Sequence, residues 1–309
     1  MPWLDYIFIK NPLRQFILGG STGAIARFAR GRMHERLSQS GEAEVVPGPS
    51  SIDRKDFLSR FLEAKDSSPN VIDDAQVFSY TVSNVNAGSD TTAISLRAIL
   101  YYTLKSSRVK RNLLRELREA LGTGNISIPV SWKQSQGLPY LDAVVKEALR
   151  LHPAVGLLLE RIVPEGGLQL PNGPFLPPGT IVGANPWIIH RHSIFGSKVN
   201  EFIPERWLRG HEEPEIEFQK RRQNMVRSTL TFGAGPRTCI GKNISLLEIY
   251  KLIPSMLLTY DVCLLLYPFC CYAVDNRQIE LKDPNAEWEV TNAWFVRQKN
   301  MIVRLSQST

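Results

Sequence analysis

The fold of this chain is decided by one short segment, Phe232-Gly233-Ala234-Gly235-Pro236-Arg237-Thr238-Cys239-Ile240-Gly241. Glycine adopts left-handed backbone conformations at little steric cost, so Gly233 and Gly235 permit a tight loop. Pro236 stiffens the turn, because its ring restricts the backbone. Such a loop can direct backbone amides toward one central atom, and the sulfur of Cys239 is the candidate for that atom.

Cys239 lies just before a helical pattern that contains Ile244 and Leu247. The positive end of a helix dipole favours the thiolate form of a cysteine placed there. We expect amide groups to surround the sulfur and Phe232 to cover it from water. A buried, inert cysteine is the alternative interpretation. The ten-residue pattern favours a thiolate ligand instead.

The composition is that of a globular protein with one large core or two smaller ones: 309 residues, 43% of them hydrophobic and 22% charged. The net charge is +7, with basic residues interleaved with acidic ones. This pattern argues against a nucleic-acid partner and fits a surface that faces anionic lipid or an acidic protein, with a solvated basic surface as the alternative. The four cysteines have no metal-finger spacing and are too sparse for a disulfide scaffold, so a reducing compartment is expected.

The N-terminal third is predicted to be helical. Residues 1–40 carry one apolar face, made of Ile25, Phe28, Met33 and Leu37. A short helix is expected over residues 54–65. Residues 74–105 contain no proline, so a single helix of ~30 residues and ~45 Å can run through them. Asp73 and Asp74 are suitable residues to cap its start.

The rest of the chain is predicted to be helical, with a small sheet in the middle. Helices are expected over 107–121 and 139–152, the second opened by a proline in the favoured first turn. Residues 154–185 alternate β-branched runs with proline and glycine turns, which indicates a small sheet. Short helices and loops fill 186–231, and the helical pattern returns after Cys239. The fold class is therefore mainly α with a small β part.

Two acid–base motifs accompany the cysteine loop. Glu147 and Arg150 are three residues apart in the predicted helix 139–152, so they share a face and can pair. Taken alone, they fit a surface ion pair equally well. Arg206, in the segment Phe202-Ile203-Pro204-Glu205-Arg206-Trp207, is a candidate third member of a buried charge set.

The segment Ala87-Gly88-Ser89-Asp90-Thr91-Thr92 lies in the middle of the predicted helix 74–105. Gly88 is unfavourable inside a helix, and Asp90 and Thr91 can compete for backbone hydrogen bonds. We therefore expect a local opening of the helix. A glycine that allows close helix packing beside solvated polar residues is the alternative.

The motifs together resemble the cytochrome P-450 superfamily and indicate a fungal-type member. Its haem-binding signature, Phe-x-x-Gly-x-Arg-x-Cys-x-Gly, is matched at every fixed position, by Phe232, Gly235, Arg237, Cys239 and Gly241. The resemblance implies the C-terminal portion of the P-450 fold, N-terminally truncated. It makes 1–72 the helices before the oxygen-groove helix, 73–105 that helix, 139–152 the Glu-x-x-Arg helix and 232–241 the haem-thiolate loop.

The resemblance also implies a role for each matched residue. Cys239 would be the axial ligand of the iron of haem b, with Arg237 and Arg161 on the haem propionates. The remaining cofactor-binding positions would be Phe232, Gly233 and Gly241. The catalytic acid–alcohol pair that organises proton delivery would be Asp90 and Thr91. The structural triad that holds the loop would be Glu147, Arg150 and Arg206, and residues 154–159 would line the substrate pocket.

By the same resemblance, the protein is a haem-dependent monooxygenase that inserts one atom of dioxygen into a small apolar organic substrate of secondary metabolism. Electrons would come from NADPH through a separate reductase, docked on the cysteine side near Lys242, and a membrane surface is a further candidate partner. The family implies the endoplasmic reticulum membrane; the sequence shows no anchor, which leaves the cytoplasm as an alternative. The competing hypothesis is a non-catalytic, truncated remnant that binds haem poorly or not at all. An isomerase or peroxide-using enzyme is disfavoured by Asp90 and Thr91.

Residues 262–278 depart from the family pattern, because they are rich in cysteine and aromatic residues and have no clear periodicity. We interpret them as a retained intron or another gene-model error, with a genuine insertion as the alternative. Their most apolar part, 262–274, is shorter than the ~20 residues that a membrane-spanning helix needs.

Overall fold

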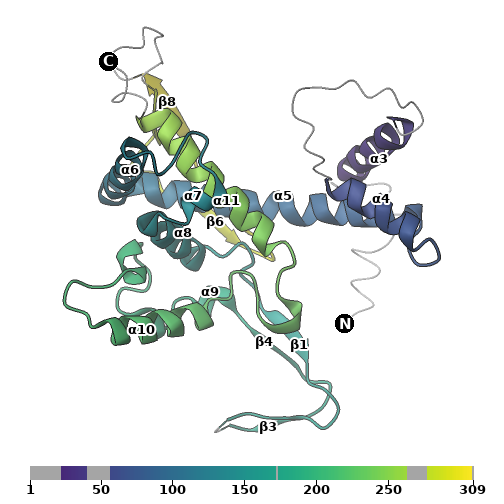
Figure 1. Cartoon of the computed structure of the whole chain (residues 1–309). Helices are drawn as coiled ribbons and strands as arrows, with labels where there is room; N and C mark the ends of the chain where they lie inside the picture. The colour runs from purple at the N-terminus through teal and green to yellow at the C-terminus, as the bar shows by residue number, and fades with distance from the viewer. Residues whose placement is uncertain (1–21, 40–55, 172, 263–276, 308–309) are drawn as a thin grey trace. The chain divides into compact units, whose positions relative to one another are not determined.

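The computed structural model describes residues 22–39, 56–171, 173–262 and 277–307, and its chain trace is drawn in Figure 1. The chain divides into two compact units, Met1–Asp90 and Thr91–Thr309. The division falls inside helix α5 (Asp74–Lys105). The interpretation of residues 262–278 as a gene-model error falls outside the described residues, apart from the two ends of that segment.

In the first unit, helices α3 (Thr22–Gln39) and α4 (Phe57–Ser67) are joined through Asp56. One oxygen of this N-cap carboxylate accepts a hydrogen bond from the Ser59 amide at 2.8 Å, and the other accepts one from Arg36 of α3 at 2.6 Å. The Ser59 amide and, less strongly, the Arg36 guanidinium hold the pKa of the Asp56 carboxyl below its usual range. One side chain thus both starts α4 and attaches it to α3.

The predicted apolar face of α3 is partly wrong. Ala29 and Met33, four residues apart, are the buried pair, whereas Phe28 is 55% exposed. Phe28 lies about 100° around the helix from Ala29, so both cannot face the same side. Its ring instead lies under the guanidinium of Arg32, 5.6 Å from the ring centroid. The predicted helical residues 1–21 fall outside the described part of the chain.

Helix α5 is continuous over its 32 residues, and Asp73 caps it by accepting from the Gln76 amide at 2.8 Å. The expected opening near Gly88 is therefore wrong. A glycine costs about 1 kcal/mol relative to alanine in a helix interior, which is too little to break so long a run of hydrogen bonds. Further along, the Ser95 hydroxyl donates to the Thr91 carbonyl at 2.9 Å, within an unbroken helix.

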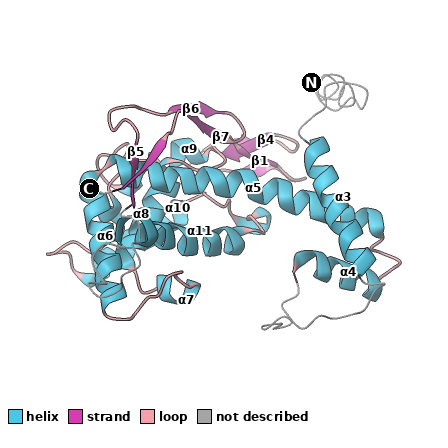
Figure 2. Ribbon diagram, turned by 90° about the horizontal axis from the view of Figure 1, so that it is seen from above, coloured by secondary structure: helices cyan, strands magenta, loops and turns pink. Residues whose placement is uncertain are grey.

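The main core of the second unit lies between the C-terminal part of α5 and three helices, α6 (Ser107–Gly122), α8 (Pro139–Leu151) and α11 (Lys242–Leu257), shown from two directions in Figures 1 and 2. The short helix α7 (Trp132–Ser135) packs on α11, which continues as a π-helical turn, η4 (Leu258–Val262). Helix α6 is strongly amphipathic. Its apolar face buries Val109, Leu113, Leu114 and Leu117. Burial of such a stripe is what stabilises a helix of this length.

Within the described part of the chain, the strands form four antiparallel pairs. The pair β1 (Leu159–Ile162) and β4 (Ile181–Ala184) flanks the pair β2 (Leu168–Gln169) and β3 (Phe175–Leu176) in the chain. At the C-terminal end, β5 (Arg277–Leu281) pairs with β8 (Val303–Gln307), and β6 (Glu289–Asn292) pairs with β7 (Val296–Lys299). The fold is mainly α with small sheets, as predicted.

Short elements connect the β4 strand to the cysteine loop. They are α9 (Pro186–Ile189), the 3-10 turns η1 (Ser193–Phe195) and η2 (Pro204–Trp207), α10 (Glu215–Ser228) and the 3-10 turn η3 (Gly235–Arg237). Among the described residues, no helix has both the length and the apolar character to cross a bilayer.

The β6–β7 hairpin is attached to the second unit's part of α5. The Gln298 side chain donates to the Ile94 carbonyl at 2.9 Å, and Arg97 donates back to the Gln298 carbonyl at 2.9 Å. One turn further, the rings of Tyr101 and Trp288 stack at 3.9 Å. The segment that follows residues 263–276 is therefore held by specific polar and aromatic contacts.

Candidate active site

The cysteine loop is a tight backbone structure that leads directly into α11. Gly233 and Gly235 both have positive φ, +72° and +68°, as only glycine adopts readily. The Cys239 amide donates to the Phe232 carbonyl at 2.8 Å and closes the loop, while the Gly233 amide donates to the Leu230 carbonyl at 3.0 Å. Cys239 thus stands three residues before the first residue of α11.

The thiol of Cys239 is exposed, and it is a free cysteine. The expectation that Phe232 covers the sulfur from water is wrong for this structure. The Phe232 ring packs against the main core instead, where burial of its apolar surface is favourable, and the Lys242 ammonium lies 6.0 Å from its centroid. The Cys239 amide is used within the loop rather than around the sulfur. Next to it, the Ile240 side chain is fully exposed.

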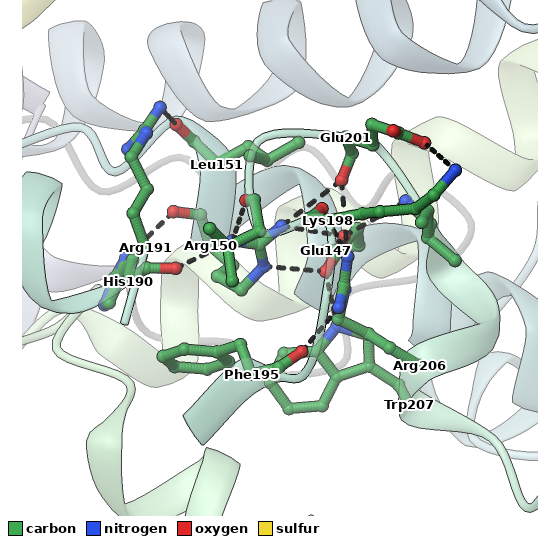
Figure 3. A network of polar contacts seen from close by, with 12 residues as sticks. Glu147, Arg150, Leu151, His190, Arg191, Phe195, Lys198, Glu201, Arg206 and Trp207 are labelled. Carbon is green, nitrogen blue, oxygen red and sulfur yellow. Dashed lines mark hydrogen bonds and ion pairs between the residues drawn. The ribbon is translucent and has the colours of Figure 1, made fainter. Parts of the chain in front are cut away.

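A buried ion set lies around Glu147, whose carboxylate is 0% exposed (Figure 3). Arg150, one turn further along α8, donates to both of its oxygens at 2.9 Å. Arg206 of η2 donates to one oxygen at 2.8 Å, and the Ile203 amide donates to the same oxygen at 3.0 Å. The structure therefore brings Glu147, Arg150 and Arg206 together, and the surface ion pair alternative does not apply.

The two arginines of this set also hold the chain between α9 and η2. Arg150 donates to the carbonyls of His190 and Val199, each at 2.7 Å. Arg206 donates to the carbonyls of Phe195 and Lys198. A buried guanidinium needs an acceptor for each of its N–H groups. The two arginines therefore fix these backbone carbonyls as well as the Glu147 carboxylate.

Trp207 is a member of the ion set that the sequence analysis did not identify. Its indole N–H donates to the second oxygen of Glu147 at 2.9 Å, and its ring is 4% exposed beside Phe195 and Met225. The signal was its position directly after Arg206, because a buried tryptophan usually finds a hydrogen-bond acceptor.

The first turn of α11 lies beside α5. The Thr92 hydroxyl donates to the Ser245 hydroxyl at 3.2 Å, and Thr92 is 7% exposed. Thr91 is the preceding residue and therefore lies about 100° around α5 from this contact; it is half-buried. Asp90 is exposed on the same helix. The roles of Asp90 and Thr91 stay predictions.

The two arginines expected on haem propionates are both exposed and lie on different elements. Arg237 is the last residue of η3, two residues before Cys239. Arg161 is in β1, opposite Val182 of β4, and donates to the Glu160 carbonyl at 2.7 Å. Of the expected pocket residues 154–159, Ala154 is buried, whereas Leu157 and Leu158 are exposed.

The residues of the loop fit a haem group. An exposed thiol at the N-terminal end of a 16-residue helix can supply the soft anionic ligand that iron takes in haem-thiolate proteins. Gly241 lies close to the sulfur, since a side-chain carbon built there would be 3.9 Å from it, an ordinary van der Waals contact. Ile240 provides exposed apolar surface beside the thiol, and Arg237 provides a cation for a carboxylate. The protein is thus mainly α, and the chemistry of its cysteine loop fits a haem-thiolate type of site.

The comparisons with known proteins agree with this class. The family model for Cytochrome P450 matches residues 7–265. The chain is 41% identical over 308 residues to the Cytochrome P450 monooxygenase cicH of Emericella nidulans, covering 99% of this chain and 55% of that protein. It is 42% identical over 277 residues to a Cytochrome P450 monooxygenase of Aspergillus terreus, covering 89% and 53%, and 38% identical over 308 residues to cfoH of Aspergillus candidus, covering 99% and 52%.

The chain belongs to the cytochrome P450 family, and the family resemblance drawn from its motifs is confirmed. It spans about half the length of the curated relatives it matches.

Replacement of Trp207 by Phe tests the extended ion set. The replacement keeps an aromatic ring, although a smaller one than the indole, and one oxygen of the buried Glu147 carboxylate loses a donor. We expect the free energy of unfolding to fall by about 1–3 kcal/mol, as for a buried charged group with one partner removed. Urea denaturation measures the loss. Trp132→Phe is the matched control, because Trp132 is 38% exposed; equal losses in the two variants would contradict the assignment.

The burial of two histidines predicts that the free energy of unfolding depends on pH. Burial lowers the pKa of His152 and of His190 to about 4, from the ordinary 6.5. The unfolded chain therefore binds more protons than the folded chain between these values. The stability contribution is complete above pH 6.5 and is lost as the pH falls toward 4, by up to about 3 kcal/mol for each ring.

Urea unfolding midpoints measured at intervals between about pH 7.5 and pH 5 test this dependence. His152→Gln should flatten the slope, whereas the exposed His211→Asn should leave it unchanged. A His152→Gln slope as steep as that of the wild type would exclude the proposed cause.

Proposed function

We propose that this chain carries the haem-binding part of a monooxygenase that inserts one atom of dioxygen into a small apolar organic substrate. The observation that carries the proposal is the exposed Cys239 thiol, placed by a glycine-shaped loop at the start of α11. Family membership supports it, and the relatives named above are monooxygenases. The bound haem b would supply the activation of dioxygen.

The residues of the chain would each perform a simple physical task in this function. Cys239 is the thiolate ligand, and the exposed guanidinium groups of Arg237 and Arg161 pair with the two haem carboxylates. Phe232, Gly233 and Gly241 shape the loop. The buried set of Glu147, Arg150, Arg206 and Trp207 keeps the loop's supporting chain in one position, since loss of any member leaves a buried charged group with fewer hydrogen-bond partners.

Proton delivery is assigned to Asp90 and Thr91. A carboxyl group and a hydroxyl group can pass protons to a bound oxidant from consecutive positions of one helix. The contact between Thr92 and Ser245 supports this assignment, because it holds the second unit's part of α5 in register with the start of α11.

The electron donor is proposed to be a separate reductase that takes electrons from NADPH. The exposed Lys242, two residues after Ile240 and at the start of α11, offers positive charge beside the thiol for an acidic partner. A membrane surface is a second proposed contact of the protein, by analogy with the family's usual place at the endoplasmic reticulum.

The reduced carbon-monoxide spectrum of the purified chain, reconstituted with haem, tests the proposed function. We expect the wild type to show a thiolate-type Soret band and Cys239→Ala to lose it, because no other side chain would replace the anionic ligand. Cys239→Ser, which keeps the size but weakens the donor, should shift the band. A wild type without a thiolate-type band would leave the non-catalytic alternative as the function of this chain.

Thr91→Val tests the proton assignment. It removes the hydroxyl with little change of shape, so the fraction of NADPH electrons released as hydrogen peroxide, with a supplied reductase, should rise by about tenfold. Thr92→Val is the control, since its hydroxyl contacts Ser245 and its loss should affect stability instead. An equal release of peroxide by both variants would refute the assignment.

A further inference from the structure

His190 is a fully buried residue that connects the ion set to the root of the cysteine loop. It follows α9 directly and is 0% exposed. Its Nδ1 lies 3.0 Å from the Arg150 carbonyl oxygen, and its Nε2 accepts from the Leu230 amide at 2.7 Å. The ring thus joins the end of α8 to a residue two positions before Phe232.

The two partners of the ring select one tautomer. The Leu230 amide can only donate, so Nε2 must be unprotonated and accept. The Arg150 carbonyl can only accept, so Nδ1 must carry the proton and donate. Both requirements are met by the same neutral form, and a doubly protonated ring would place two donors against each other at Nε2.

The contact between His190 and Arg150 is reciprocal. The Arg150 guanidinium, already paired with Glu147, donates to the His190 carbonyl at 2.7 Å. The His190 ring donates in return to the Arg150 carbonyl. The ring and the backbone of His190 are therefore both bonded to Arg150 of the buried ion set.

Leu230 connects His190 to the cysteine loop by hydrogen bonds of its own backbone. The Leu230 carbonyl accepts from the Gly233 amide at 3.0 Å, and the Phe232 carbonyl accepts from the Cys239 amide at 2.8 Å. Leu230 thus has its amide held by His190 and its carbonyl used by the first glycine of the loop. A longer contact, from the Thr231 hydroxyl to the Leu149 carbonyl at 3.4 Å, supports the same junction from α8.

We propose that His190 is a positioning residue for the thiolate ligand, which transmits the placement of the Glu147–Arg150 ion pair to the Cys239 loop through its hydrogen bond to Leu230. The inference rests on the proposed function of Cys239 as ligand. Burial, together with the charges of Arg150 and Arg191, lowers the pKa of the ring to about 4, which agrees with a neutral tautomer at neutral pH.

Two amide substitutions separate the bonds of the ring. In His190→Asn the side-chain amide overlaps Nδ1, so it can still donate to the Arg150 carbonyl but cannot reach Leu230. In His190→Gln the amide lies one bond further out and overlaps Nε2, so it can still accept from Leu230. Each variant loses one neutral hydrogen bond, and urea denaturation of both variants measures separately the cost of the smaller Asn side chain at this buried position.

The test compares the full chain and both variants, reconstituted with haem, by the ratio of thiolate-type to non-thiolate Soret absorbance in the reduced carbon-monoxide complex. We expect His190→Asn to lower this ratio roughly fivefold, the equilibrium factor of one net hydrogen bond, and His190→Gln to stay close to the wild type. Equal ratios in the two variants would overturn the inference.

A second readout does not depend on haem. Deuterium labelling of the Cys239 amide, which donates to the Phe232 carbonyl and closes the loop, should be faster in the haem-free His190→Asn chain than in His190→Gln. A wild type without a thiolate-type band would contradict the proposed function, whereas equal labelling rates would contradict the role of His190. If His190→Asn alone fails to fold, the Leu230 bond is a core contact and the positioning role is wrong.

If neither variant folds, hydrogen exchange in the wild type decides. The amides of Leu230 and Gly233 should then exchange together, with the same dependence on denaturant. Independent exchange of the two amides would overturn the inference.

Discussion

The buried carboxylate of Glu147 is the constraint on which the second unit depends. It accepts five hydrogen bonds, from Arg150, Arg206, Trp207 and the Ile203 amide. An unpaired charge in the interior would cost several kcal/mol, so any arrangement that moves one donor away is strongly disfavoured. One donor residue, Arg150, is in α8, and the other three lie in η2 or directly before it. The carboxylate therefore holds these two segments in a single mutual arrangement. The carboxylate is thus a source of specificity, whatever its net contribution to stability.

The arginines around Glu147 also bind backbone carbonyls of the chain between α9 and η2. Arg150 uses its outer nitrogen on the His190 and Val199 carbonyls, and Arg206 uses its outer nitrogens on Phe195 and Lys198. Loops normally vary because few contacts hold them. Here the guanidinium groups of Arg150 and Arg206 hold the chain between α9 and η2 at several carbonyls, so this segment has little conformational freedom.

The parts of the site that could be predicted from the sequence are those set by local geometry. Glu147 and Arg150 are three residues apart on a helix, and Gly233 and Gly235 take the left-handed conformations that their positions indicated. The residues outside α8 that donate to Glu147 were harder to predict, because Trp207, for example, is separated from Glu147 by 60 positions in the sequence. His190 carries no local signal at all, since its role depends on which two backbone groups the fold places beside it.

The wrong predictions have a common physical cause. Two predictions, the opening of the helix at Gly88 and the covering of the sulfur by Phe232, both assumed that the preference of one residue decides local structure. In α5 the summed hydrogen bonds of a 32-residue helix exceed the cost of one glycine. At Phe232, burial against the core competes with contact to the thiol, and the core contact prevails. The apolar face expected at Phe28 failed for a similar reason, because Ala29 occupies the buried side of α3.

The charges of the ion set do not cancel within the set itself. One carboxylate faces two guanidinium groups, which leaves one net positive charge in an environment where Glu147 and Arg150 are 0% exposed and Arg206 is 7% exposed. Carbonyl dipoles compensate part of that charge. Electrostatic interactions in such an interior are screened far less than in water. The surplus positive charge is thus a reason why the two guanidinium groups bind backbone carbonyls of the chain between α9 and η2, so the same charges that pair with Glu147 also fix that chain.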